Sequence, residues 1–314
     1  MSAFGFQSTT DEVCAGVDLS GKQAVITGAS SGLGVETARS LAQCGAAVLM
    51  VARDAQKLDA AVAQVREAVP GASLDTALLD LADLDSVRAG AADILARAPS
   101  IDLLINNAGV MACPLLRTAQ GFEMQIGTNH LGHFLLTGLW APALVAAAPS
   151  RVINLSSAGH RFAPVDMDDP NYTHRDYDKW QSYGQSKTAN ALFSVGLDQR
   201  LQGRGVRAFA VHPGMIMTEL SRHMVPEDFT QIARGRKPEE LQFKTVEQGS
   251  ATSVWAATSA DLEGLGGLYL EDCHIAEPAV EGGDDGVEAY ALDPELADQL
   301  WQLSEDFVGE HFDF

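Results

Sequence analysis

The sequence predicts a doubly wound α/β fold of about seven parallel strands flanked by helices. Short apolar runs recur along the chain, and the stretches between them are long enough to hold helical crossovers. A glycine-rich segment, 28–34, directly follows the first of these runs. The 314 residues, of which 46% are hydrophobic, can bury one large core. Together these observations favour one α/β domain over two.

Seven apolar runs have the length and composition of strands that are buried on both faces. They are Ala24–Ile26, Ala47–Val51, Leu74–Leu79, Leu103–Ile105, Val152–Leu155, Ala208–Val211 and Leu268–Leu270. Helical patterns lie around and between these strands. We predict helices over Thr10–Ala15, Val35–Ala42, Ala55–Ala68, Leu84–Arg97, Phe122–Ala148 with a break near Gly127, Tyr183–Leu201, Val246–Thr258 and Pro294–Phe307.

The chain divides into three parts. Residues 1–20 are a polar N-terminal arm, and residues 21–272 form the α/β domain. Inside this domain, residues 158–182 are a long polar insertion and residues 215–245 a second loop region, and long loops are commonly functional. Residues 273–314 form an acidic C-terminal extension, which we expect to pack on the domain.

The composition argues against several classes of partner. A net charge of −21 repels nucleic acid and anionic membranes. The most apolar stretch, 134–148, is shorter than the roughly 20 residues that a membrane-spanning helix needs, so we expect no membrane anchor. The cysteines, Cys14, Cys44, Cys113 and Cys273, form no C-x-x-C pair, and the N-terminus has no signal-peptide pattern. We therefore expect a cytoplasmic protein.

The segment between the first strand and the next helix is suited to hold a dinucleotide. Glycines let the main chain bend close to phosphate oxygens, and the N–H groups of the following helix would point at them. Expected cofactor contacts are Gly28, Ser30, Ser31, Gly32, Leu33 and Gly34. A glycine turn that serves only packing is the alternative, which this segment alone leaves open.

Arg53 ends the second strand, where an acidic residue would bind an unphosphorylated ribose. A guanidinium there suits a 2′-phosphate, so NADP(H) is favoured over NAD(H). Two alternatives stay open. Arg53 could be a surface residue paired with Asp54 or Glu67, and Asp54 would still permit use of NAD(H).

The carboxyl ends of the third and fourth strands should face the same ligand, because ligands of such sheets bind at that edge. Residues expected there are Asp80, Leu81, Asn107, Ala108 and Gly109. For Asn106, a turn that only stabilises the strand is an equally good interpretation.

Tyr183 and Lys187 are four residues apart and share one face of a predicted helix. A phenol has an ordinary pKa of about 10, which a neighbouring ammonium and an oxidised nicotinamide would lower toward the range of acid–base catalysis. The Y-x-x-x-K pattern is common by chance. Here Ser156 and Ser157 end the preceding strand and can place a hydroxyl beside the same substrate oxygen.

Six motifs, from about Asp18 to Tyr269, resemble those of the short-chain dehydrogenase/reductase family, which has a Rossmann-type fold. They are TGASSGLG, NNAG, TNHLGHF, NLSS, YGQSK and HPGMIMT. The resemblance implies that Tyr183 is the general acid and base, and that Ser157, rather than Ser156, polarises the substrate oxygen. It further implies that Lys187 holds the nicotinamide ribose and that Asn129 anchors a water.

The same resemblance implies that a loop holds the nicotinamide carboxamide, through Pro213, Gly214, Ile216 and Thr218. The long interval before Tyr183 and the segments GLYLEDCHIAEP and YALDPE are similar to the retinol dehydrogenase and WW-domain-containing oxidoreductase branch. The implied function is NADP(H)-dependent interconversion of an alcohol and a carbonyl on a lipophilic or bulky small molecule, in a homodimer or homotetramer. A catalytically silent NADP(H)-responsive protein is the alternative.

Several histidines and methionines near these motifs allow more than one interpretation. His130 and His133 share a helical face, but no carboxylate lies at ligand spacing, so we expect no metal. His160 and His174 fall in the insertion, either at a substrate entrance or on a solvated loop. The methionines that follow the expected cofactor loops could line an adaptable apolar pocket or belong to the core. They are Met111, Met215, Met217 and Met224.

Overall fold

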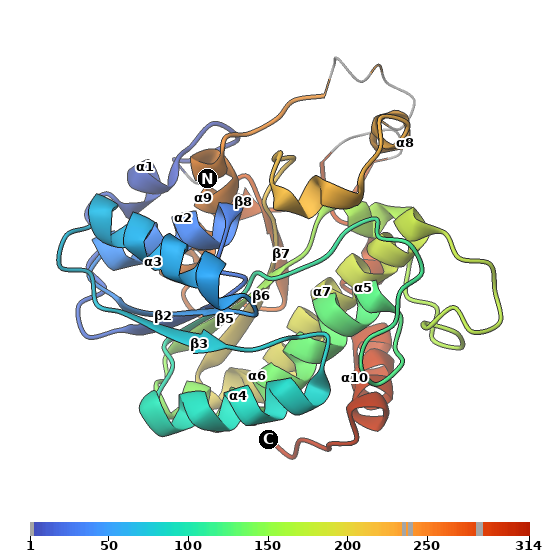
Figure 1. Ribbon diagram of the computed structural model, residues 1–314, viewed down its shortest axis with the longest axis horizontal. Helices are drawn as coiled ribbons and strands as arrows, with labels where there is room; N and C mark the ends of the chain where they lie inside the picture. Colours follow the sequence, from blue (N-terminus) through green and yellow to red (C-terminus); the bar gives the residue numbers. More distant parts are fainter. Residues whose placement is uncertain (1–2, 234–236, 238–240, 281–284) are drawn as a thin grey trace.

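The computed structural model describes residues 3–233, 237, 241–280 and 285–314 (Figure 1). Its sheet has the strand order β3-β2-β1-β4-β5-β6-β7-β8. The strands are β1 Gln23–Thr27, β2 Ala47–Ala52, β3 Leu74–Leu78, β4 Leu103–Asn106, β5 Ser150–Leu155, β6 Val206–His212, β7 Leu268–Glu271 and β8 His274–Ile275. The seven predicted parallel strands are confirmed. The two-residue β8 pairs antiparallel with β7, and it was too short to be predicted.

Helices cover both faces of the sheet (Figure 1). On one face lie α1 Thr10–Cys14, α2 Gly32–Gln43, α3 Ala55–Ala68 and α9 Val246–Thr258. On the other lie α4 Leu84–Arg97, α6 Gly132–Ala146, α7 Lys179–Leu201 and α10 Pro294–Val308. The short helix α5 Met124–Ile126 packs against α7, and α8 Asp228–Ile232 lies outside these layers. The predicted doubly wound α/β fold is therefore confirmed.

Side-chain caps explain where most of the helices begin. Asp54, Asp83 and Asp178 each accept hydrogen bonds from N–H groups in the first turn of α3, α4 and α7. The cap at Asp178 starts α7 at Lys179, so this helix begins four residues before the predicted start at Tyr183. Helices α3, α4 and α9 have the predicted bounds.

The break predicted near Gly127 is a π-helical turn over Gly127–Leu131, which joins α5 to α6. Close packing requires a glycine here, since an added Cβ would lie 2.4 Å from Cγ2 of Thr118. Turns of this kind widen a helix locally and are frequent at functional sites. The π-helical turn places Asn129 beside the loop that follows β4.

Both ends of the chain pack on the domain. In the N-terminal arm, α1 contributes Val13 and Cys14 to the core beneath α2 and α9. In the C-terminal extension, Trp301 on α10 packs with Phe134, at 4.9 Å between ring centroids. Beside it, Ser304 Oγ and His130 Nε2 are hydrogen-bonded at 2.7 Å. Among the described residues, no helix combines the length and the apolar character that crossing a membrane requires.

Candidate active site

The site lies between β1 and β4, where the strand order reverses. The crossovers from these two strands run to opposite faces of the sheet, and this opens a crevice at the carboxyl ends of the strands. Two adjoining cavities occupy this crevice, of about 310 Å³ and about 570 Å³. Residues shared by both linings are Leu33, Asn107, Gly109, Thr218 and Leu220.

The smaller cavity is built on the glycine turn after β1. Gly28 has a φ of +66°, and an added Cβ would lie 2.7 Å from Cα of Ala108. A Cβ on Gly34 would lie 2.3 Å from the carbonyl oxygen of Gly28. Asn107 Nδ2 donates to the carbonyl of Thr27 at 2.8 Å and ties the end of β4 to this turn. The turn can therefore hold its shape only with glycine at these positions.

Helix α2 points its first turn at this cavity without a side-chain cap. Its N-cap residue, Ser31, makes no capping hydrogen bond, although aspartates cap α3, α4 and α7. The N–H groups of the first turn and the helix dipole suit an anionic group. Ser30, Gly32 and Leu33 line the same wall. The turn and helix thus fit the pyrophosphate of a dinucleotide.

Three cationic residues, Arg53, Lys57 and Arg222, line the smaller cavity. The expected alternative pairing of Arg53 with Asp54 does not occur, because Asp54 caps α3 through the N–H of Lys57. Across the residues that the structure describes, no carboxylate forms an ion pair with Arg53, whereas Lys57 Nζ pairs with Glu219 at 2.7 Å. Lys57 and Arg222 belong to no short motif, so the sequence alone did not indicate them.

The residues predicted at the ends of the third and fourth strands also line the smaller cavity. They are Asp80, Leu81, Asn107, Ala108 and Gly109. Asp80 Oδ1 accepts from the N–H of Ala82 at 2.9 Å, which fixes the loop after β3. Asn106 instead points into the core, where its Nδ2 donates to Thr137 Oγ1 and Asn154 Oδ1. Of the two interpretations of Asn106, the structural one is therefore correct.

Ser157, Tyr183 and Lys187 meet in the larger cavity. Ser157 caps the 3₁₀ turn Ala158–Phe162, and its Oγ accepts from the N–H of Gly159 at 3.0 Å. Ser156 is more deeply buried and donates its hydroxyl to the carbonyl of Lys187 at 2.8 Å. The Ser157 hydroxyl is thus the one that faces the Tyr183 phenol.

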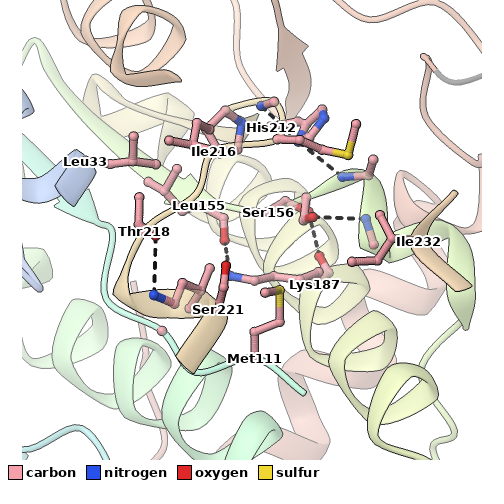
Figure 2. Close-up of a pocket in the computed structure, with 18 of the residues that line it drawn as sticks. Leu33, Met111, Leu155, Ser156, Lys187, His212, Ile216, Thr218, Ser221 and Ile232 are labelled. Carbon is pink, nitrogen blue, oxygen red and sulfur yellow. Dashed lines mark hydrogen bonds between the residues drawn. The ribbon is translucent and has the colours of Figure 1, made fainter. Parts of the chain in front are cut away.

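Burial dominates the electrostatics of this group. It raises the pKa of Tyr183 to about 12, which the hydrogen bond with Ser157 partly opposes, and it lowers the pKa of Lys187 to about 7. Lys187 Nζ donates to the carbonyl of Leu155 at 2.9 Å (Figure 2) and lies 5.7 Å from the centroid of the Tyr183 ring. Without cofactor charge, the pKa of Tyr183 therefore moves opposite to the lowering that the sequence suggested.

The Asn129 side chain holds the loop after β4 against α7. Its Nδ2 donates to the carbonyl of Val110 and to Ser186 Oγ, both at 2.9 Å, and its Oδ1 accepts from the N–H of Val110 at 2.8 Å. This loop contains Gly109, whose added Cβ would lie 3.7 Å from Lys187 Nζ. The water expected at Asn129 stays a prediction.

The loop after β6 forms the far wall, with Pro213, Gly214, Ile216 and Thr218 in its lining (Figure 2). Gly214 has a φ of +92°, and an added Cβ would lie 2.8 Å from Cδ of Lys244.

Behind this loop, the buried Lys244 ammonium pairs with Asp272 and lies 4.8 Å from the centroid of the Phe6 ring. Asp272 and Phe6 also line the larger cavity. Sequence reasoning missed all three, because they come from distant parts of the chain.

The rest of the larger cavity is mostly apolar. All four methionines predicted near the cofactor loops line it, so the pocket alternative is correct for Met111, Met215, Met217 and Met224. Aromatic and aliphatic side chains complete this lining, namely Phe162, Trp180, Phe229, Ile232 and Phe243. Within the predicted loop region 215–245, residues 234–236 and 238–240 lie outside the described residues.

His130 and His133 are structural, and His174 is exposed on the insertion, so the solvated-loop interpretation is correct for His174. His133 Nε2 is hydrogen-bonded to Thr27 Oγ1 at 2.8 Å, and His130 contacts α10. No group of His, Cys, Asp or Glu side chains that could hold a metal occurs in the described part of the chain. Both interpretations of His160 were wrong: it lies neither at an entrance nor on a solvated loop but is completely buried, between Ser157 and the C-terminal extension.

Known proteins are similar to this chain over most of its length. The family model for short chain dehydrogenases matches residues 22–228. The chain is 44% identical to the "Probable oxidoreductase" of Streptomyces lividans, over 93% of this chain and 99% of that protein. It is 40% identical to retinol dehydrogenase 11 of Mus musculus, over 93% and 88% of the two chains.

A crystal structure of an uncharacterised protein from Mycobacterium paratuberculosis aligns with a TM-score of 0.75 and 35% identity, over 96% of this chain and 98% of that one. These relatives align with this chain over 93% to 96% of its length. The protein therefore belongs to the short-chain dehydrogenase/reductase family, on its retinol dehydrogenase-like branch, and is an oxidoreductase of alcohol and carbonyl groups.

Proposed function

We propose that this protein is an NADP(H)-dependent oxidoreductase that interconverts an alcohol and a carbonyl on a lipophilic or bulky small molecule. The observation that carries the proposal is the meeting of Ser157, Tyr183 and Lys187 in one apolar cavity that adjoins the glycine-rich crevice. A merely nucleotide-responsive protein has no need for a buried phenol, lysine and hydroxyl around one point.

The proposed roles follow from the contacts. A bound nicotinamide would supply the hydride in reduction and accept it in oxidation. Tyr183 Oη gives its proton to the substrate oxygen during reduction and takes it back during oxidation. Ser157 Oγ accepts a hydrogen bond from the N–H of Gly159, so the hydroxyl hydrogen is not used in that contact. Ser157 donates this hydrogen to the same substrate oxygen. Lys187, when protonated, stabilises the phenolate that Tyr183 leaves behind.

Arg53, Lys57 and Arg222 support the preference for NADP(H), because three cations line the smaller cavity in a strongly acidic protein. A 2′-phosphate there would find at least one guanidinium that no carboxylate of the described residues neutralises. The members of this family use NAD(H) or NADP(H), and Arg53 favours the phosphorylated form.

The substrate class follows from the lining of the larger cavity. A volume of about 570 Å³ accommodates a molecule of substantial size, and the methionines and aromatic side chains favour apolar surface. Met217, Val225 and Phe243, each at least 44% exposed, continue the apolar surface around the loops that border the cavity.

The test is turnover by the purified protein with NADPH and a panel of aromatic, steroidal and retinoid carbonyls. We expect loss of NADPH absorbance with the wild-type protein and none with Tyr183→Phe, which retains the ring but lacks the proton. NADPH titration of the same variant should give an unchanged affinity. Turnover that survives in Tyr183→Phe contradicts the assigned acid, and tight NADPH binding without turnover of any panel member favours the silent alternative.

A further inference from the structure

His160 links the C-terminal extension to Ser157 through two ring nitrogens. Its side chain is completely buried in the 3₁₀ turn after Ser157. His160 Nε2 accepts from the main-chain N–H of Glu288 at 3.1 Å. On the other side of the ring, Nδ1 lies 2.7 Å from the main-chain carbonyl oxygen of Ser157.

These two partners determine where the hydrogen of the neutral ring lies. A main-chain N–H only donates, so Nε2 must carry a lone pair. A carbonyl oxygen only accepts, so Nδ1 must carry the hydrogen and donate it to Ser157. Tyr269 Oη, 3.2 Å from Nδ1, is a second neighbour of the same nitrogen.

The hydrogen bond from His160 acts on the residue whose hydroxyl faces Tyr183. The Ser157 carbonyl also accepts from the main-chain N–H of His160 at 2.9 Å, while Ser157 Oγ accepts from Gly159. Three donors from one tight turn therefore fix both oxygens of Ser157. Loss of the His160 side-chain donor would leave the Ser157 carbonyl with one donor, the main-chain N–H of His160, and would loosen the position of Ser157.

We propose that His160 is a positioning residue for Ser157, and that the main-chain N–H of Glu288 sets its tautomer. The chain from Glu288 through His160 to Ser157 makes the C-terminal extension part of the catalytic machinery. The inference rests on the role proposed above for Ser157, but the tautomer can be measured independently of activity.

The first test is the ¹⁵N chemical shifts of the His160 ring in the wild-type protein, assigned by comparison with His160→Asn. The Nδ1–H tautomer is expected at neutral pH. A ring with its hydrogen on Nε2 overturns the proposal, whatever the activity of the enzyme.

The second test compares Glu288→Pro with Glu288→Ala. Both variants lose the ion pair between Arg161 and Glu288, but only proline also loses the N–H. Glu288 has a φ of −68°, which proline can adopt. The preceding residue, Val287, forms a β-bridge with Pro278, and an extended backbone is the one that a residue before proline prefers. We expect Nδ1–H alone in Glu288→Ala and a measurable Nε2–H population in Glu288→Pro, where only the Ser157 carbonyl still favours Nδ1–H. The same tautomer in both variants contradicts the role of Glu288.

The third test separates the two ring nitrogens. In His160→Asn the amide nitrogen takes the place of Nδ1, and in His160→Gln the amide oxygen takes the place of Nε2. We expect kcat to fall about 10-fold or more in His160→Gln and to be largely rescued in His160→Asn, with the KM for NADPH unchanged in both. Equal losses of kcat that follow the loss of thermal stability would show a purely structural role.

If Tyr183→Phe retained turnover while the ¹⁵N shifts showed Nδ1–H, the proposed acid would fail and the proposed tautomer would stand.

Discussion

The Tyr183 ring packs directly on Gly159: a Cβ added to Gly159 would lie 2.6 Å from Cε1 of the tyrosine. The same turn provides the N–H that Ser157 Oγ accepts. Gly159 therefore sets the distance between the two hydroxyls at the centre of the larger cavity.

Gly159→Ala should push the Tyr183 ring away from Ser157. Displacement of about 1 Å at a reacting group can cost on the order of 100-fold in rate, so we expect kcat to fall at least about 10-fold while the affinity for NADPH holds. Steady-state kinetics and NADPH titration measure both. Gly203→Ala is the matched control, because nothing lies within 4 Å of its added Cβ. Unchanged kcat in Gly159→Ala would show that the ring tolerates this methyl group.

Lys187→Met should stabilise the cofactor-free protein at low pH while it abolishes turnover. Burial lowers the pKa of Lys187 from its usual 10.5 to about 7, so the folded protein binds fewer protons than the unfolded chain between these values. The charged Lys187 side chain therefore destabilises the folded protein at pH 6, and this destabilisation disappears as the pH rises through this window. The carbonyl of Leu155 keeps a donor in the variant, Asn190 Nδ2 at 2.9 Å.

Thermal unfolding at pH 6 and pH 10 checks the prediction for Lys187. The melting temperature of Lys187→Met should exceed that of the wild-type protein at pH 6, and the difference should shrink by pH 10. Lys57→Met, at an exposed position on α3, should show no such pH-dependent difference. A constant difference across the window would mean that Lys187 titrates normally.

Arg53→Ala should weaken NADPH binding selectively. A charge-assisted hydrogen bond contributes about 1.5–3 kcal/mol, so we expect the KM for NADPH to rise roughly 10- to 100-fold and the KM for NADH to change little. Kinetics with both cofactors measure the ratio. Arg66→Ala, in the last turn of helix α3, is the control. Equal losses with NADPH and NADH would place Arg53 away from the 2′-phosphate.

Trp301→Ala should destabilise the fold without changing the chemistry. The Trp301 side chain is 3% exposed and packs on Phe134 and Phe193, while the lining of the larger cavity does not include it. Truncating such a side chain costs about 3–5 kcal/mol in the free energy of unfolding. Urea unfolding should show this loss, and kcat at low temperature should hold. The neighbouring Gln302→Ala should have little effect, and a similar loss there would point to the helix rather than to the ring.

Much of the fold could be predicted because its determinants are local. Helices α3 and α4 follow capping aspartates and have the predicted bounds, and the glycine turn after β1 combines strand, turn and helix within a few residues. Tyr183 and Lys187 were found in the same way, because one helix carries both.

The missed features depend on contacts between distant segments. His160 meets Tyr269 and Glu288, more than 100 residues away, so its neighbours in the sequence gave no indication of its burial. Lys244 likewise depends on Phe6 and Asp272. The sequence shows the cation near Tyr183 but not the depth of burial that raises the pKa of the phenol in the cofactor-free protein.

The packing of α10 has a consequence for the order in which the protein can mature. The aromatic surface around Phe134 is covered by Trp301 and Phe312, which are translated after every strand of the sheet. During synthesis, the growing polypeptide therefore completes its sheet while this surface is still bare, and such surface is prone to aggregation. This aromatic surface is covered only after the C-terminal segment has left the ribosome and α10 has packed on it.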